Sequence, residues 1–349
     1  MAADGLRWEA VPEEEAGTPV IATQVQSPSL ATLRWESVPA LEVIEPRRAI
    51  AESLELPDPG ALPEQAPPAV PKIRGVARGI TVNGLPYPDV GVFVPNGFAM
   101  DPEFTVSAIL DGVNRTRSCR VVDGGNWLDC ADTVAYLEVT PLKLDNFSMG
   151  LQWSVQSLTA RNQGTATFAG QSLGFRMAWN LTPTTGIAFG GEHIIQFDNT
   201  IDLGRNFYLV LSQAVPLGRG TQPPMLVGTV GIGSDFYGFG NTEGNGTLGS
   251  TDCLSGNNVS SPDYPQGRDC YWGPIGSISL ALNSRLAFGA EWFGYGFGAG
   301  VSLRPFKELP VTFSLYATDF LGNTPDYIQE GCTTDPCEAR YYGKMTVSF

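Results

Sequence analysis

The sequence lacks a long apolar run and is poor in charge. Its 349 residues contain no stretch of about 18 consecutive apolar residues, which excludes a transmembrane helix. Only 16% of the residues are charged, a low share for the surface of a soluble protein. The 21 lysines and arginines are outnumbered by 36 aspartates and glutamates, and the net charge of −15 argues against a nucleic-acid partner.

The N-terminus lacks the apolar core of a signal peptide, although the cysteines indicate an oxidising compartment. The six cysteines form three local pairs in loop-like segments: Cys119 with Cys130, Cys253 with Cys270, and Cys332 with Cys337. Their spacings match no zinc pattern, so we expect disulfides rather than metal ligands, and no cofactor. Either a precursor segment has been removed, or the true start lies upstream.

Residues 1–72 differ in composition from the rest of the chain. They hold 11 of the 27 prolines, and 12 acidic residues against 5 basic ones, so they cannot bury enough apolar surface to form a core. We expect a disordered, acidic, proline-rich arm. Its repeat, LRWEAVP at 6–12 and LRWESVP at 33–39, is either duplicated linker or a linear motif in which Trp8 and Trp35 anchor a partner.

Residues 73–102 contain two short β-like runs broken by Asn-Gly and by proline, a pattern that predicts a hairpin. This hairpin would lie either below the main domain or inside it as a plug.

From residue 103 to residue 349, apolar and polar residues alternate, which predicts an all-β domain. Several of the roughly twelve expected strands reach the ten or so residues that a tilted strand needs to cross a bilayer. The expected strands are 103–111, 133–141, 146–158, 169–182, 184–197, 206–215, 224–234, 271–283, 285–293, 294–304, 310–320 and 341–349.

The connections between these strands differ in length on the two sides. Those after odd-numbered strands are long, apart from a tight turn at Gly294, and they hold all three cysteine pairs. The connections after even-numbered strands are short. This arrangement is typical of an antiparallel, up-and-down transmembrane β-barrel with long external loops and short periplasmic turns.

A secreted or surface-attached β-sandwich that binds glycan or protein is the alternative, because its strands also alternate. Two features favour the barrel. Aromatic residues on the apolar face gather near strand ends, as in membrane-interface girdles. The other face carries glycine, serine and alanine, and few of the lysines and glutamates of a water-facing surface.

The final strand, YYGKMTVSF, resembles the C-terminal strand of Gram-negative outer-membrane β-barrel proteins. It ends on Phe349 and carries Tyr341, Met345 and Val347 at alternate positions before it. The resemblance implies that the barrel-assembly machinery reads this strand, which then closes the barrel against the first strand. It also implies an outer-membrane location in the lipid bilayer, with the arm 1–72 in the periplasm near an envelope partner. The Leu-Arg-Trp-Glu-x-Val-Pro repeat is loosely similar to marine cyanobacterial envelope proteins.

Six charged residues are expected to point into the lumen, where they would form structural ion pairs, filter solutes, or do both. They are Arg176, Glu192, Asp198, Glu291, Arg304 and Lys344. His193, the only histidine, has no serine close to it in sequence, so a place near the membrane interface is favoured over a role in a membrane-embedded hydrolase. We expect no enzyme, but a porin-like passive channel for small solutes or a plugged surface barrel.

Overall fold

The computed structural model describes most of the chain beyond residue 69. The described residues are 70–115, 128, 131–158, 168–197, 205–234, 250–252, 269–294, 296–307, 309–320 and 339–349. The chain divides into two compact units, Met1–Glu64 and Gln65–Phe349, and every described residue belongs to the second. Within these ranges, no helix is long and apolar enough to cross a membrane.

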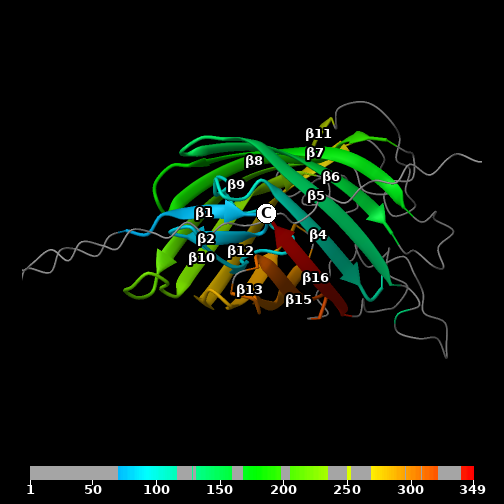
Figure 1. Ribbon diagram of the computed structural model, residues 1–349. Coiled ribbons are helices and arrows are strands. Elements are labelled where there is room, and N and C mark those ends of the chain that lie inside the picture. Colours follow the sequence, from blue (N-terminus) through cyan, green and yellow to red (C-terminus); the bar gives the residue numbers. More distant parts are fainter. Residues whose placement is uncertain are drawn as a thin grey trace, which may run out of the picture. The chain divides into compact units, whose positions relative to one another are not determined.

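Twelve strands form one closed antiparallel sheet (Figure 1). They are β4 (Val106–Val113), β5 (Asp132–Lys143), β6 (Phe147–Ser157), β7 (Ala169–Asn180), β8 (Thr185–Gln196), β9 (Asn206–Pro216), β10 (Met225–Ser234), β12 (Asp269–Asn283), β13 (Leu286–Trp292), β14 (Phe297–Leu303), β15 (Val311–Thr318) and β16 (Arg340–Ser348). Each strand pairs with its neighbour in sequence, except that β10 pairs with β12. The short β11 (Ser250–Asp252) pairs with the start of β12 and takes no part in the ring.

The pairing of the last strand with the first closes the ring. β16 runs antiparallel to β4 from Tyr342 opposite Val113 to Ser348 opposite Ser107. The backbone N–H of Phe349 adds a hydrogen bond of 2.8 Å to the carbonyl of Val106. The predicted all-β barrel of twelve strands is therefore confirmed, and the two-sheet sandwich is wrong because one sheet closes on itself.

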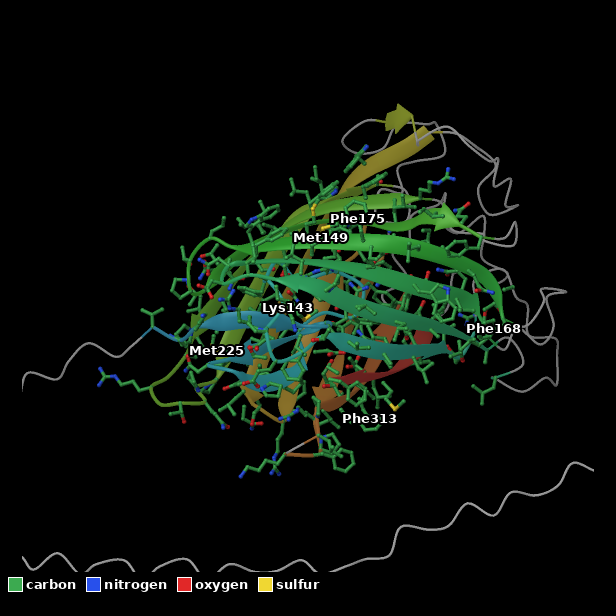
Figure 2. All side chains as sticks on the ribbon, turned by 45° about the horizontal axis from the view of Figure 1, so that its top comes forward. Lys143, Met149, Phe168, Phe175, Met225 and Phe313 are labelled. Carbon is green, nitrogen blue, oxygen red and sulfur yellow. The ribbon has the colours of Figure 1, made fainter. Side chains whose placement is uncertain are left out.

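The outer face of the barrel is apolar along every strand. Between the strand ends, the outward positions of the described strands carry no charged side chain. Met149 and Phe313, both labelled in Figure 2, lie on this face with about two-fifths of their surface exposed. The belt includes Leu110, Leu137, Leu151, Trp179, Ile195, Leu209, Leu211, Val230, Ile232, Ile278, Phe288, Trp292, Leu303, Leu315 and Tyr341.

The inner face is built from small and hydroxyl-bearing residues. Hydroxyl groups on neighbouring strands bond to each other at 2.7–2.9 Å in the pairs Ser154–Ser172, Ser107–Ser348, Ser302–Ser314 and Ser212–Thr229. All of these side chains are buried. Because successive side chains point to opposite faces of a strand, an apolar outside and a polar inside arise from the same alternating sequence.

Residues 72–105, which precede β4, lie inside the ring (Figure 1). Strands β1 (Ile73–Val76), β2 (Gly79–Val82) and β3 (Leu85–Asp89) form a small antiparallel sheet, where the sequence analysis expects a two-stranded hairpin. An irregular stretch follows and leads into β4. We call residues 72–105 the plug.

The apolar core of the molecule lies between the plug and the wall. One cluster joins Ile73, Ile80, Val82, Tyr87, Val90 and Phe98 of the plug to Ala214, Met225, Val227, Ala281 and Ala287 of the wall. A second cluster joins Val94 and Ala99 of the plug to Ala178, Ala188, Tyr208, Val210, Ile275 and Phe293. The wall residues are mostly small, so the plug supplies most of the bulk that fills the lumen.

Both ends of the plug lie at the barrel end that carries the short turns. The N–H of Ile73 bonds to Pro183 in the turn between β7 and β8, and the N–H of Thr105 bonds to the carbonyl of Phe349. Tyr87 reaches the same end, where its hydroxyl donates to the carbonyl of Pro223 at 2.9 Å. The plug therefore enters and leaves the lumen on one side.

One close contact inside the wall depends on a glycine. Gly300 on β14 lies directly opposite Tyr316 on β15, and the tyrosine ring covers it. A Cβ at position 300 would overlap the carbonyl of Leu315 and the ring of Tyr316. Because that carbonyl is fixed in the sheet, the ring and the backbone would both have to move.

We predict that Gly300→Ala lowers the free energy of unfolding by about 1–3 kcal/mol, the usual range for overpacking a filled site. Gly228→Ala is the matched control, since an added Cβ there meets nothing within 4 Å. Urea denaturation of both variants, followed by tryptophan fluorescence, measures the difference. Equal stability of the two variants would contradict the packing described here.

Candidate functional site

The candidate site is the contact surface between the plug and the lumen wall. The irregular stretch 90–104 cannot satisfy its own backbone groups as a strand or a helix does, and buried backbone groups without partners are costly. Side chains of the wall bond to them instead: Ser279 donates to Val90 at 2.6 Å, Gly97 donates to Ser212 at 2.8 Å, and Met100 donates to Ser148 at 2.9 Å.

Glu291 is the most heavily used of these wall side chains. It lies on β13 with 1% of its surface exposed. Its carboxylate accepts three consecutive backbone N–H groups of the plug, from Val92, from Phe93 at 2.9 Å and from Val94 at 2.7 Å. Hydrogen bonds from backbone N–H groups to a carboxylate are stronger than neutral ones, so this contact fixes the middle of the plug.

Lys344 and Asp89 form a buried ion pair between β16 and the plug. The Lys344 ammonium lies 3.2 Å from Asp89 Oδ2, and both side chains are almost fully buried. The hydroxyls of Ser314 and Thr346 donate to the same oxygen at 3.3 Å. Asp111 stands directly across the sheet from Lys344, so the ammonium has a carboxylate on the wall as well as one on the plug.

Arg176 and Asn180, both on β7, hold residues 96–99 of the plug against the wall. The Arg176 guanidinium donates to the carbonyls of Asn96 at 2.9 Å and Phe98 at 2.7 Å. Asn180 accepts the N–H of Ala99 at 2.7 Å and donates to the carbonyl of Ile73. These bonds join the start of the plug, at Ile73, and its later residues 96–99 to the same strand of the wall.

Two further lumen candidates bind the strands of the plug. Glu192 on β8 lies 3.4 Å from the Arg78 guanidinium, at the turn between β1 and β2. Its second oxygen accepts a bond of 2.9 Å from Asn206. Arg304, which follows β14, donates to the carbonyls of Pro86 at 3.2 Å and Lys307 at 2.9 Å. Five of the six charged residues that were expected to point into the lumen thus contact the plug or lie beside it.

His193 points into the barrel with 3% of its surface exposed, and a serine that is distant in sequence is close to it in space. Its Nδ1 lies 2.7 Å from the hydroxyl of Ser172 on β7, and Gln156 Nε2 lies 2.9 Å from its Nε2. A bulge explains this orientation: His193 has a φ of +56°, and the β7–β8 register shifts beside it. Glu192 and His193 therefore both face inward. Ser172 is fully buried, so this pair belongs to the packing of the wall.

Several predicted residues lie outside the described part of the chain. They are Trp8, Trp35, Asp198, Cys119, Cys130, Cys253, Cys332 and Cys337. Cys270 belongs to β12, but the position of its side chain is not described. The proposed disulfides stay a prediction. Among the described residues, no group of three or more His, Cys, Asp or Glu side chains could hold a metal ion.

The terminal strand places its apolar residues on the outer face. Tyr341 and Phe349 are exposed, while Met345 and Val347 are partly exposed between them. Phe147 and Trp179 pack together at the short-turn end with ring centroids 4.4 Å apart, whereas Trp292 and Tyr341 lie toward the other end. Aromatic residues thus occur near both ends of the barrel.

The sequence analysis missed the plug partners Arg78 and Asp89. Each is an isolated charge in a glycine- and proline-rich stretch, and nothing in its neighbourhood indicates burial. The available signal was the presence of a few glutamate, lysine and arginine residues on the inward face of wall strands that otherwise carry small residues there. Such charges need partners, and the plug is the segment that the topology brings close to them.

No protein-family model and no curated protein matches this chain. Among solved structures, the chain is similar to OprB of Pseudomonas putida, determined at high pH. The match has 8% identity and a TM-score of 0.30, and covers 70% of this chain and 94% of that chain.

We predict that Asp89→Asn destabilises the barrel, because it removes the plug carboxylate from the buried Lys344 ammonium. Breaking a buried ion pair lowers the free energy of unfolding by about 3–5 kcal/mol. We expect a loss at the lower end of this range because Asp111, opposite Lys344 on the neighbouring strand, remains as a second carboxylate. The double variant Asp89→Asn with Lys344→Met should lose less than the sum of the two single variants. A double-mutant cycle of unfolding free energies tests this coupling, and strict additivity would contradict it.

Proposed function

We propose that this protein is an outer-membrane β-barrel, porin-like in architecture, whose own plug restricts the lumen to solutes much smaller than an open barrel would admit. The plug carries this proposal: a buried carboxylate, a buried ion pair and two apolar clusters hold it in the lumen. It is a fixed part of the fold, bound to strands around the whole ring.

The location in a membrane is supported by the outer face. A continuous apolar belt on twelve strands, without charge between the strand ends, far exceeds the apolar patches of a few hundred Å² that soluble monomers expose. Aromatic residues near both ends match the two interfaces of a bilayer. A closed barrel also leaves no strand edge unpaired in lipid. Closed β-barrels with such a belt are characteristic of bacterial outer membranes.

A matched pair of leucines tests the membrane placement. Leu315 lies within β15 with 62% of its surface exposed, and Leu309 lies in the turn before β15 with 57% exposed. We predict that Leu315→Arg costs about 2–4 kcal/mol in lipid vesicles, because arginine then faces the hydrocarbon core, and that Leu309→Arg costs at most about 1 kcal/mol. Urea unfolding of protein inserted in vesicles gives both values.

An equal cost for the two substitutions would show that the belt faces water. A protein that remains soluble and monomeric without detergent, and whose mobility in SDS gels does not change on heating, would contradict the membrane proposal outright.

A second experiment tests whether the plug limits passage. Glu291→Gln keeps the size of the side chain but leaves one acceptor oxygen for three plug N–H groups, and each unsatisfied group costs about 1–3 kcal/mol. We predict that this variant shows large conductance steps in planar bilayers more often than the parent protein. Glu103→Gln, at an exposed position near the end of the plug, is the control. Identical traces for parent, Glu291→Gln and Glu103→Gln would contradict the proposal that the plug restricts passage through the lumen.

A further inference from the structure

The plug contacts the two sides of the lumen differently. On one side, β3 packs against β12, β13, β14 and β15, and the buried contacts of Asp89, Val90 and Val92 lie there. On the other side, between the plug and the wall formed by β5 to β9, there is a small cavity whose lining includes four charged side chains. We call this second side the seam.

The cavity in the seam extends along the wall. Its lining includes Ser148 near the short-turn end of β6, and Glu192 and Tyr208 nearer the opposite ends of β8 and β9. Its volume of about 30 Å³ is enough for about two water molecules. The lining mixes apolar residues with six charged or amide side chains, Arg78, Asn96, Glu138, Gln152, Arg176 and Glu192.

The ion pair in the seam is wetter than the ion pair on the opposite side. The side chains of Arg78 and Glu192 keep 11% and 13% of their surface exposed, against 2% and 3% for Lys344 and Asp89. The Arg78–Glu192 distance of 3.4 Å is also the longer of the two. The Arg78–Glu192 pair therefore keeps surface open to the cavity that it lines.

The charges that line the cavity balance. Arg78 and Arg176 face Glu138 and Glu192. Arg176 donates to plug carbonyls and so holds the plug to the wall, whereas Glu138 accepts a bond of 2.9 Å from Gln152 and so joins β5 to β6. Arg78 and Glu192 form the direct charge contact between the plug and β8. In a narrow passage, fixed charges of this kind decide which ions enter.

We propose that water and small monovalent ions cross the plugged barrel along the seam, and that Arg78 and Glu192 set the charge selectivity of this path. The proposal rests on the membrane-spanning barrel proposed above and adds the route and the class of permeant. A balanced pair makes the path weakly selective between cations and anions. Removing either partner leaves a net charge, and the sign of that charge predicts the direction of the change.

The test uses the full chain in planar bilayers with a potassium chloride gradient. Arg78→Gln leaves the seam negative, so the reversal potential should move toward cation selectivity. Glu192→Gln leaves it positive, so the reversal potential should move toward anion selectivity. We expect a several-fold change in the permeability ratio in each case, with opposite signs. The charge swap Arg78→Glu with Glu192→Arg restores the balance and should return the ratio to that of the parent.

Lys307→Gln is the matched control, because it removes one positive charge from an exposed turn outside the seam and should leave the permeability ratio unchanged. Heat-dependent mobility in SDS gels confirms that each variant is folded. If one single variant does not fold, the other single variant and the charge swap decide the sign.

Failures of the two proposals can be distinguished. A folded, membrane-inserted parent that passes no current at high protein load would overturn the seam path and leave the barrel intact. Reversal potentials that stay at the parent value in both single variants, or that shift in the same direction, would overturn the role of Arg78 and Glu192. A protein that never inserts into lipid would overturn the proposed function itself.

Discussion

The structure depends on finding hydrogen-bond partners for an irregular stretch of chain enclosed by a barrel. Strand and helix backbones satisfy their own polar groups, but residues 90–104 do neither, and most of them are buried. Side chains of the wall form hydrogen bonds with these backbone groups. They are the carboxylate of Glu291, the guanidinium of Arg176, the amide of Asn180 and several serine hydroxyls. Two of the lumen charges, Glu291 and Arg176, serve this purpose, and Lys344 and Glu192 form ion pairs with other residues of the plug.

The wall has an apolar outer face and a mostly small, polar inner face because successive side chains of a strand point to opposite sides. Outward positions carry leucine, valine, phenylalanine and tryptophan, whereas inward positions carry glycine, alanine and serine with a few charges. Small inward residues leave space that only another segment can fill. The plug fills it with Ile73, Ile80, Tyr87 and Phe98, all with at most 1% of their surface exposed. The hydrogen bonds and the apolar clusters thus both hold the plug in the lumen.

The wall could be predicted from the sequence because alternation is a local property. All twelve strands were located to within about three residues at each end, and the closing pair β4–β16 is the pair that the resemblance of the final strand implied. Partners across the lumen could not be predicted in the same way. The Asp89–Lys344 and Arg78–Glu192 ion pairs join residues far apart in sequence, so no local sequence pattern indicates them. The inward orientation of His193 could not be predicted for a different reason, because the bulge beside it breaks the alternation of the strand.

The position of the apolar core between plug and wall has a consequence for cooperativity. Neither part can bury its own apolar residues: the three short strands of the plug have no second layer of their own, and the inward wall residues are too small to fill the lumen. Removing one part exposes the apolar surface of the other to water. The plug and the barrel should therefore melt together in one transition. The change in sequence pattern near residue 103 marks where the chain passes from the inside of this single cooperative unit to its shell.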